Sequence, residues 1–182
     1  MEYTPKNENG KMRVLATVLF FGGLICLFLS PAGLLLPSGY WQLAGMVVWC
    51  GCAYVMVRYI LTSYTYRIVP RSLDTDHPMP WEMDFVVNRV QGGRSVPMVR
   101  MSLEYLTELI YVGDKDYRSL PEYVNYRDAK IYVHVVNASR KDRYMAVFTA
   151  PSGEHYAVLF EPSQQMAAYL NEIKGKGGPD LQ

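Results

Sequence analysis

Four carboxylates gather in one short segment of the chain, at Asp74, Asp76, Glu82 and Asp84. Carboxylate oxygens are the ligands that hard divalent cations such as Ca²⁺ prefer, so the segment is a candidate metal site. Its spacing matches no known cation-binding loop, and prolines interrupt it. We therefore predict a solvated loop, and keep a metal-dependent enzyme that uses the acidic loop 74–84 as the weaker alternative.

The histidines and cysteines form no set with the spacing of metal ligands or of a catalytic group. His77, His134 and His155 lie far apart in the sequence, whereas a zinc site needs several N or S ligands that converge. All three cysteines fall in the apolar N-terminal part of the chain, which excludes a disulfide-rich secreted module. The sequence thus predicts no bound metal, no cofactor and no catalytic residues, and we expect a protein that is not an enzyme.

The glycine pair in Gln91-Gly92-Gly93-Arg94 has the composition of a phosphate-binding loop but not its pattern. Such a loop needs a longer glycine spacing, a Lys-Ser/Thr pair and a following helix. Here a strand pattern follows, so the segment predicts a hairpin turn, in which glycine supplies the positive φ that tight turns need.

Arginines concentrate in the segments next to the apolar part of the chain. Each could add roughly 1 kcal/mol of attraction near an anionic lipid surface, although the nearby carboxylates offset part of that field. The chain also carries 15 tyrosines, and Tyr and Arg are common anchors of protein interfaces. The candidate contacts for a lipid or a protein partner are Arg58, Arg67, Arg71, Arg89, Arg94 and Arg100.

The charge balance of the polar part argues against two classes of protein. From Leu61 onward there are 14 Lys and Arg against 15 Asp and Glu, a net charge of −1. A nucleic-acid-binding protein usually carries a basic surplus, so we expect no nucleic-acid partner. A disordered tail would need a higher net charge and fewer apolar residues.

Two uncharged apolar stretches, Val14 to Leu36 and Tyr40 to Val57, are separated only by Pro37-Ser38-Gly39. A helix needs about 20 apolar residues to cross a bilayer, and the second stretch reaches Ile60 if Arg58 extends to the headgroups. The sequence therefore predicts a transmembrane α-hairpin, an integral part of the lipid bilayer. Its glycines favour close helix packing and leave a homodimer through the hairpin open.

Lysines and arginines set the expected orientation of this hairpin. Lys6, Lys11 and Arg13 precede the first stretch, basic residues follow the second, and the turn between them is uncharged. By the positive-inside rule, both termini should be cytoplasmic.

After the hairpin, the hydrophobic pattern changes to the alternation of β-strands. A helical turn capped by Ser102, a tyrosine-rich loop over 113–129 and a C-terminal amphipathic helix over Gln165–Ile173, with Pro162 in its first turn, interrupt or follow the strands. The pattern predicts a mainly-β domain of about seven strands, built as a partly open barrel or bent sandwich. The predicted strands are Tyr64–Val69, Met83–Val90, Arg94–Met101, Glu108–Val112, Lys130–Asn137, Arg143–Thr149 and Glu154–Phe160.

These elements divide the chain into four expected parts. A cytoplasmic N-terminal tail covers 1–13, the transmembrane hairpin 14–60, the cytoplasmic β domain 61–174 and a disordered tip 175–182.

The order of these elements resembles the bacterial pleckstrin-homology-like membrane proteins. The residues that carry the resemblance are Tyr66-Arg67-Ile68 just past the hairpin and the run from Phe160-Glu161-Pro162 to Leu170. The resemblance implies a pleckstrin-homology-like fold, a location in the bacterial inner membrane and no particular activity. The basic run of the family after its first strand is replaced here by Val69-Pro70-Arg71-Ser72 and the acidic loop.

Together these observations predict a membrane-anchored, non-enzymatic binding or scaffold protein that presents its β domain to an unknown protein partner. The alternative is a sensor of anionic-lipid headgroups.

Overall fold

The computed structural model describes residues 1–29, 38–71, 79, 82–137 and 142–174. The chain divides into two units, a helical hairpin of Asn7–Thr62 and a β domain formed by Met1–Lys6 with the described residues from Ser63 on. The predicted turn at 37–39 lies partly outside the described residues, and Asp74, Asp76, His77 and the tip 175–182 lie wholly outside them.

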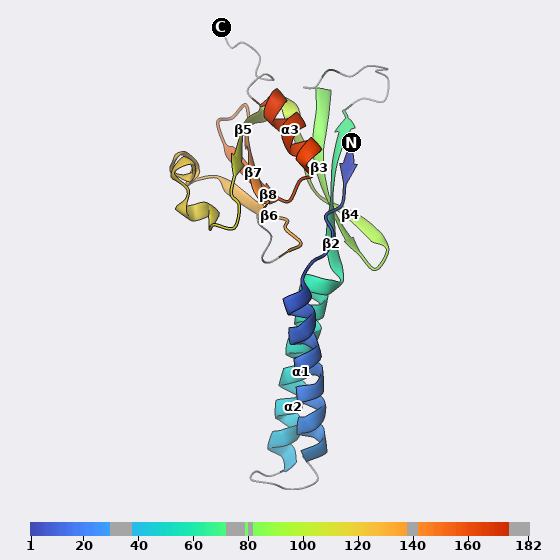
Figure 1. The fold of residues 1–182 in the computed structure, drawn as a ribbon. Helices are drawn as coiled ribbons and strands as arrows, with labels where there is room; N and C mark the ends of the chain where they lie inside the picture. The colour runs from blue at the N-terminus through green and yellow to red at the C-terminus, as the bar shows by residue number, and fades with distance from the viewer. Residues whose placement is uncertain (30–37, 72–78, 80–81, 138–141, 175–182) are drawn as a thin grey trace. The chain divides into compact units, whose positions relative to one another are not determined.

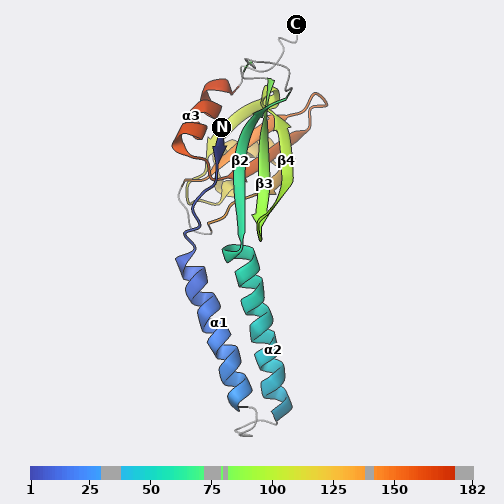
Figure 2. The same ribbon diagram turned by 90° about the vertical axis from the view of Figure 1, so that its right-hand side faces the viewer.

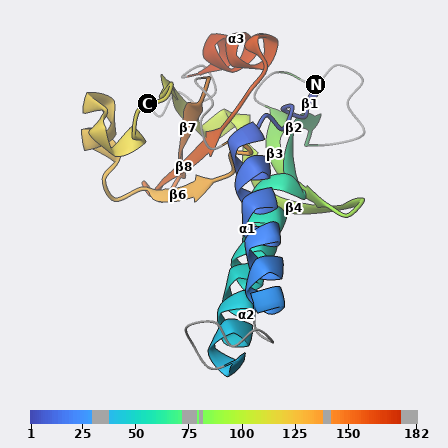
Figure 3. The ribbon, with the colours of Figure 1, turned by 60° about the horizontal axis from the view of Figure 1, so that its bottom comes forward.

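The helical unit contains α1 (Gly10–Leu29) and α2 (Ser38–Val55), which lie side by side (Figure 3). A π-helical turn, Met56–Ile60, continues α2. Gly10–Phe28 and Gly39–Ile60 have mean hydropathies of 1.8 and 1.6 and are long enough to cross a membrane. Only 11% of each apolar window is buried inside the protein, unlike a helix in the core of a soluble protein. Such exposed apolar surface supports a membrane location.

Small residues let the two helices approach closely. A Cβ on Gly23 would lie 2.2 Å from Cδ1 of Trp49, and a Cβ on Gly45 would lie 3.3 Å from the carbonyl oxygen of Gly23. The Trp49 ring stacks on Phe20, and its Nε1 donates to the Phe20 carbonyl at 3.3 Å. The glycines therefore act within the hairpin, as the sequence predicted for helix packing.

Two asparagines that precede α1 form hydrogen bonds with the end of the π-helical turn. The side-chain amide of Asn7 donates to the carbonyls of Tyr59 and Ile60 at 2.8 and 3.3 Å, and that of Asn9 donates to Tyr59 at 3.1 Å. These bonds satisfy carbonyl groups that a helix leaves without partners in its last turn.

The first sheet of the β domain has the strand order β1-β2-β3-β4. Its strands are Glu2–Tyr3, Thr62–Pro70, Met83–Gln91 and Arg94–Ser102, and Figure 2 shows β2, β3 and β4 side by side. β1 pairs antiparallel with β2, which places Glu2 opposite Arg67 and Tyr3 opposite Tyr66. The predicted N-terminal tail thus supplies an edge strand, which the sequence analysis missed because two residues are too few to show alternation.

The second sheet has the order β5-β7-β8-β6, with strands Leu106–Tyr111, Tyr144–Thr149, His155–Phe160 and Lys130–Val133. β6 pairs parallel with β8, whereas the other pairs are antiparallel. The predicted strand Lys130–Asn137 is therefore too long. β6 ends at Val133, because the chain then leaves the ladder for a buried turn in which Val136 joins the core.

The two sheets and α3 (Gln164–Ile173) enclose one hydrophobic core (Figure 1). Tyr66, Phe85 and Phe160 are fully buried there and pack ring against ring. The stripe predicted on the helix is confirmed, and its buried members include Met166, Leu170 and Ile173. The helix start is corrected, since Ser163 caps it and Pro162 precedes the cap rather than occupying the first turn.

The tyrosine-rich segment covers the other face of the second sheet. It forms two 3-10 helices, Tyr117–Ser119 and Pro121–Tyr126, rather than an irregular loop. Its residues join a second apolar cluster against strands β7 and β8, made of Ile110, Val112, Leu120, Tyr126, Met145, Val147, Ala157 and Leu159. Strands β7 and β8 of the second sheet are thus buried on both faces.

Candidate functional site

A groove of about 370 Å³ opens where the last strand of each sheet meets the other. β4 ends the order of the first sheet and β6 ends that of the second. The groove is lined by Arg100, Met101, Ser102, Tyr105, Tyr132, Phe148, Ala150 and Tyr156.

Strand register explains why aromatic side chains converge on this groove. Tyr156 of β8 stands opposite Phe148 of β7 and opposite Lys130 of β6. Phe148 belongs to the core, whereas Tyr132 is 37% exposed on the short edge strand. Directly opposite residues share a sheet face, so the core continues into the groove as a row of aromatic rings.

One rim of the groove carries a network of charges around Asp84. The Asp84 side chain is 8% exposed and accepts from Nε of Arg100 at 2.7 Å, with Nε of Arg71 at 3.5 Å. Arg71 also bonds Glu104 at 3.1 Å and the hydroxyl of Ser102. The hydrogen bond that Arg71 donates to Glu104, and then the charge of Asp84, raise the pKa of Arg71. This rim therefore presents positioned guanidinium groups at neutral pH.

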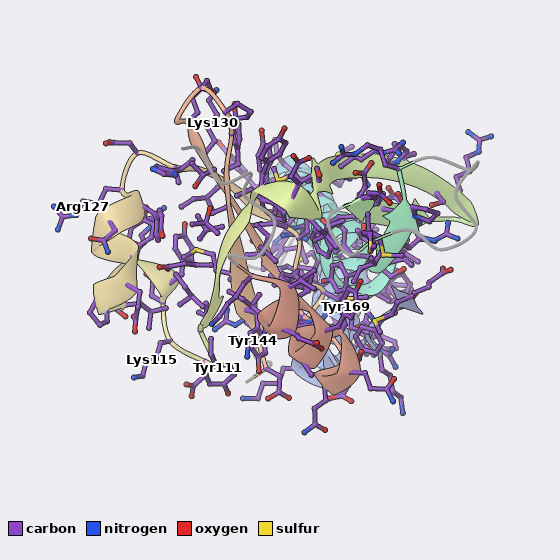
Figure 4. All side chains as sticks on the ribbon, turned by 90° about the horizontal axis from the view of Figure 1, so that it is seen from above. Tyr111, Lys115, Arg127, Lys130, Tyr144 and Tyr169 are labelled. Carbon is purple, nitrogen blue, oxygen red and sulfur yellow. The ribbon has the colours of Figure 1, made fainter. Side chains whose placement is uncertain are left out.

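The side of the groove at β8 carries a second cation and a phenol. Lys130, labelled in Figure 4, places its ammonium 5.5 Å from the centre of the Tyr156 ring, a cation–π geometry. The Tyr156 hydroxyl donates to Glu154, and this hydrogen bond raises the pKa of Tyr156. Tyr156 is thus neutral at physiological pH, with its ring facing the groove.

The rings of this groove offer apolar contact and hydroxyl groups, and the rims carry arginines paired with carboxylates and Lys130 over a ring. Tyr and Arg side chains of this kind are common interface anchors. Within the described parts of the chain, no group of three or more His, Cys, Asp or Glu side chains could hold a metal ion. Of the proposed acidic loop, Glu82 accepts from the backbone N–H of Met79 at 2.9 Å, and Asp84 is engaged with the two arginines.

The structure separates the six arginines that the sequence singled out. It brings Arg71 and Arg100 together on Asp84, and Arg89 and Arg94 together at the β3–β4 turn. Arg67 pairs with Glu2 at 3.2 Å across β1 and β2. Arg58 lies in the π-helical turn, 5.5 Å from the ring centre of Tyr59.

The sequence patterns did not single out the three groove tyrosines, Tyr105, Tyr132 and Tyr156. The excess of tyrosine drew attention to the loop over 113–129, whose residues pack on the second sheet instead. The alternation of Lys130–Val133 was the available signal, because it sets Tyr132 on the face opposite Ile131.

The two motifs behind the family resemblance meet in a buried polar network. The Tyr66 hydroxyl donates to the carbonyl of His134 at 2.6 Å and accepts from the backbone N–H of Glu161 at 3.2 Å. The Glu161 carboxylate is fully buried and accepts from the backbone and side-chain amides of Asn137 at 3.0 and 3.2 Å. These motifs thus hold the fold together at this point, and neither lines the groove.

A second hollow lies along α3, next to Tyr111 and Tyr144. The rings of these two tyrosines, labelled in Figure 4, pack edge to face with their centres 5.1 Å apart. Cavities of about 450 and 380 Å³ both have Tyr144, Gln164 and Ala167 in their lining. The larger is mainly polar, and the described residues of its lining include no cationic side chain. The groove between β4 and β6 therefore has the stronger features of a binding site.

No protein-family model, no curated protein and no solved structure matches this chain.

Proposed function

We propose that this protein is a membrane-anchored, non-enzymatic binding module whose β domain holds an extended segment of a partner protein in the groove between β4 and β6. The observation that carries the proposal is the groove itself. Two terminal strands, three tyrosines and two rims that carry Arg and Lys side chains meet in a hollow of about 370 Å³.

The geometry favours an extended peptide as the occupant. A terminal strand offers a row of backbone N–H and C=O groups, to which a peptide adds as a further strand, while side-chain pockets supply specificity. Tyr132 projects into the groove from such a strand, beside Tyr156 and Phe148. Each ring buries large apolar area at a low cost in side-chain entropy.

Anchoring makes a modest interface sufficient. A domain held at a membrane meets other membrane-bound partners at a high effective concentration, so weak contacts still produce association. We propose that the helical hairpin spans the bacterial inner membrane with both termini in the cytoplasm, and that the β domain is pleckstrin-homology-like. A homodimer through the hairpin belongs to the same proposal.

Site-specific photo-crosslinking in cells tests this function. The full chain would carry a photoreactive phenylalanine derivative in place of Tyr132, and in a matched control in place of Tyr111, which is 55% exposed and lies outside the groove. We expect position 132, and not 111, to capture one protein through a single short segment. A synthetic peptide of that segment should bind the purified full chain, and Tyr132→Ala should weaken binding by about tenfold or more.

Two results would contradict the proposal. The first is equal capture from positions 132 and 111, because the groove would then have no role. The second is a captured segment whose peptide binds the Tyr132→Ala chain as tightly as the original.

A further inference from the structure

The turn between β3 and β4 presents a cationic and apolar surface that the proposed protein-binding groove does not use. Gly92 and Gly93 have φ values of 57° and 79°, so the chain reverses there in a conformation that glycine adopts without strain. The first five residues of β4 are all exposed, although they include Val96 at 52% and Met98 at 45%. Arg89 and Arg94 flank the turn, and both are exposed.

The register places these side chains together. Arg89 stands opposite Val96, and Gln91 stands opposite Arg94, so the four residues share one face. A bulge follows, because Val87 pairs with Val99 and Asn88 with Pro97, which leaves Met98 as the extra residue. We call Arg89, Gln91, Arg94, Val96 and Met98 the hairpin tip, meaning the tip of the β-hairpin formed by β3 and β4 and not the helical hairpin.

Among the described residues, neither tip arginine pairs with a carboxylate, and the polar partner of Arg89 is neutral. Arg89 donates to the side-chain oxygen of Gln91 at 3.0 Å, which holds the guanidinium without cancelling its charge. In contrast, Arg67, Arg71 and Arg100 are each paired with a carboxylate. Among the arginines of the β domain that the sequence singled out, Arg89 and Arg94 at the tip are therefore the ones with no carboxylate partner among the described residues.

Chain length limits how far the start of β2 can lie from the last residue of the π-helical turn. Ile60 ends the π-helical turn, and three residues later the Ser63 hydroxyl donates to the carbonyl of Val90 at 3.5 Å. Three residues span at most about 11 Å even when fully extended. The headgroup layer of a bilayer is itself about 5–8 Å thick on each side, so a tip bonded to Ser63 is within reach of it.

We propose that the hairpin tip rests on the anionic lipid surface of the membrane that holds the helices, with Arg89 and Arg94 at the headgroups and Val96 and Met98 at the interface. Cationic groups around exposed apolar side chains are the composition of interfacial lipid contacts. Such a contact would limit how the domain turns on its short connection and keep one face toward the cytoplasm. The inference rests on the membrane placement proposed above.

The test uses the full chain in lipid nanodiscs with a single fluorophore. In a background with serine at the native cysteines, the label would be attached at Ser95→Cys in the tip, at Ser152→Cys in the exposed β7–β8 turn, or at Cys50 kept alone in α2. Quenching by lipids that carry a spin label near the interface then reports contact of positions 95 and 152 with the bilayer surface. For Cys50, in the middle of the second span, lipids with the spin label near the end of the acyl chain report insertion into the bilayer core. We expect stronger quenching at position 95 than at 152 when phosphatidylglycerol is present, and a loss in neutral lipid.

Neutralising the tip tests the chemistry. Arg89→Gln and Arg94→Gln should each lower, by about fivefold, the ratio of chains whose tip contacts the lipid surface to chains whose tip does not. Arg67→Gln should leave this ratio unchanged, because Arg67 is already paired with Glu2. Equal quenching at 95 and 152, or quenching at 95 that ignores both phosphatidylglycerol and the tip arginines, would overturn the proposal. In those cases a quenched label at Cys50 shows that the anchor stands and only the tip contact fails; an unquenched label there overturns the anchor and the inference together.

Discussion

At the scale of single residues, the most demanding position is the buried phenol of Tyr66. Its hydroxyl is fully enclosed, donates to the carbonyl of His134 and accepts from the N–H of Glu161. A polar group taken out of water without such bonds would cost several kcal/mol, so these contacts make the burial tolerable. They also connect β2 with the segments that follow β6 and β8.

Removing this hydroxyl should destabilise the β domain. Tyr66→Phe deletes both bonds at a fully buried position, and we expect a loss of about 1–3 kcal/mol in the free energy of unfolding. The matched control is Tyr169→Phe, because the Tyr169 hydroxyl contacts only a weak acceptor, the sulfur of Met83 at 3.4 Å. Urea unfolding of the full chain in detergent micelles, followed by circular dichroism, measures both. Equal losses would contradict the role given to the Tyr66 network.

The same phenol predicts how stability depends on pH. Burial, and then the negative charge of Glu161, raise the pKa of Tyr66 well above its ordinary value. Below the unfolded pKa of about 10, both states keep the proton and the full stability is present. As the pH rises further, the unfolded state loses the proton first, so stability falls by about 1.4 kcal/mol per pH unit until the folded pKa is passed. Unfolding curves of Tyr66→Phe at alkaline pH should show a shallower decline than those of the original chain.

Asp84 and Glu2 offer a matched comparison of ion pairs. The Asp84 side chain is 8% exposed between two arginines, whereas the side chains of Glu2 and Arg67 are 55% and 45% exposed. An exposed pair contributes little, so Glu2→Gln should cost at most about 1 kcal/mol. Asp84→Asn should cost about 1–3 kcal/mol, because it removes charged hydrogen bonds at a buried position. Urea unfolding of both variants measures these losses in the free energy of unfolding. A larger loss for Glu2→Gln than for Asp84→Asn would contradict the prediction.

At the scale of elements, close helix approach at Gly23 makes the helical unit sensitive to one methyl group. A Cβ there would meet the Trp49 ring at 2.2 Å, so Gly23→Ala should displace the ring from Phe20 and break its bond to the Phe20 carbonyl. Such overpacking costs about 1–3 kcal/mol. Gly51→Ala is the control, because a Cβ at Gly51 meets nothing within 4 Å. In chains whose other tryptophans are phenylalanine, the Trp49 emission maximum should shift for Gly23→Ala alone.

A comparison of the predicted and observed strands also shows which features of the fold local sequence patterns can predict. Strong local signals predicted β3, β4, β7 and β8 closely, because alternation and glycine turns are properties of neighbouring residues. β6 was predicted too long, and its parallel pairing with β8 was not predicted, because partner choice depends on residues far apart in the chain. The groove was not predicted for the same reason, since its lining joins four strands and the short 3-10 helix Leu103–Tyr105 that Ser102 caps.

At the scale of the whole molecule, the pairing of β1 with β2 constrains the topology. Residues 2–3 and 66–67 flank the helical unit in sequence and are joined in one sheet. Both flanks of residues 7–62 must therefore lie on the same side of any membrane that the helices cross. The charge pattern led to the same hairpin topology, but by an independent argument.

This pairing also makes the first residues part of the stability of the β domain. The backbone of Met1 exchanges two hydrogen bonds with Ile68, at 3.0 and 2.8 Å, and Thr4 bonds the hydroxyl of Thr65 at 2.8 Å. At about 0.5–1.5 kcal/mol for each bond, deleting residues 2–4 should lower the free energy of unfolding by about 2–4 kcal/mol. Insertion of the helices should be unaffected, because Asn7 and Asn9, which bond the end of α2, remain in place.

A matched variant distinguishes the contribution of the β1 backbone to stability from the contribution of its side chains. Glu2→Thr with Tyr3→Val keeps the strand and its ladder, since both new residues favour β-structure, and should retain most of the stability. Hydrogen exchange of the full chain in nanodiscs gives the local readout. The deletion should speed exchange in β2, whose Ile68 amide bonds Met1, and leave α1 and α2 unchanged. If β2 exchanged equally slowly in both variants, the N-terminal strand would contribute nothing to the fold, and the topological argument would lose its support.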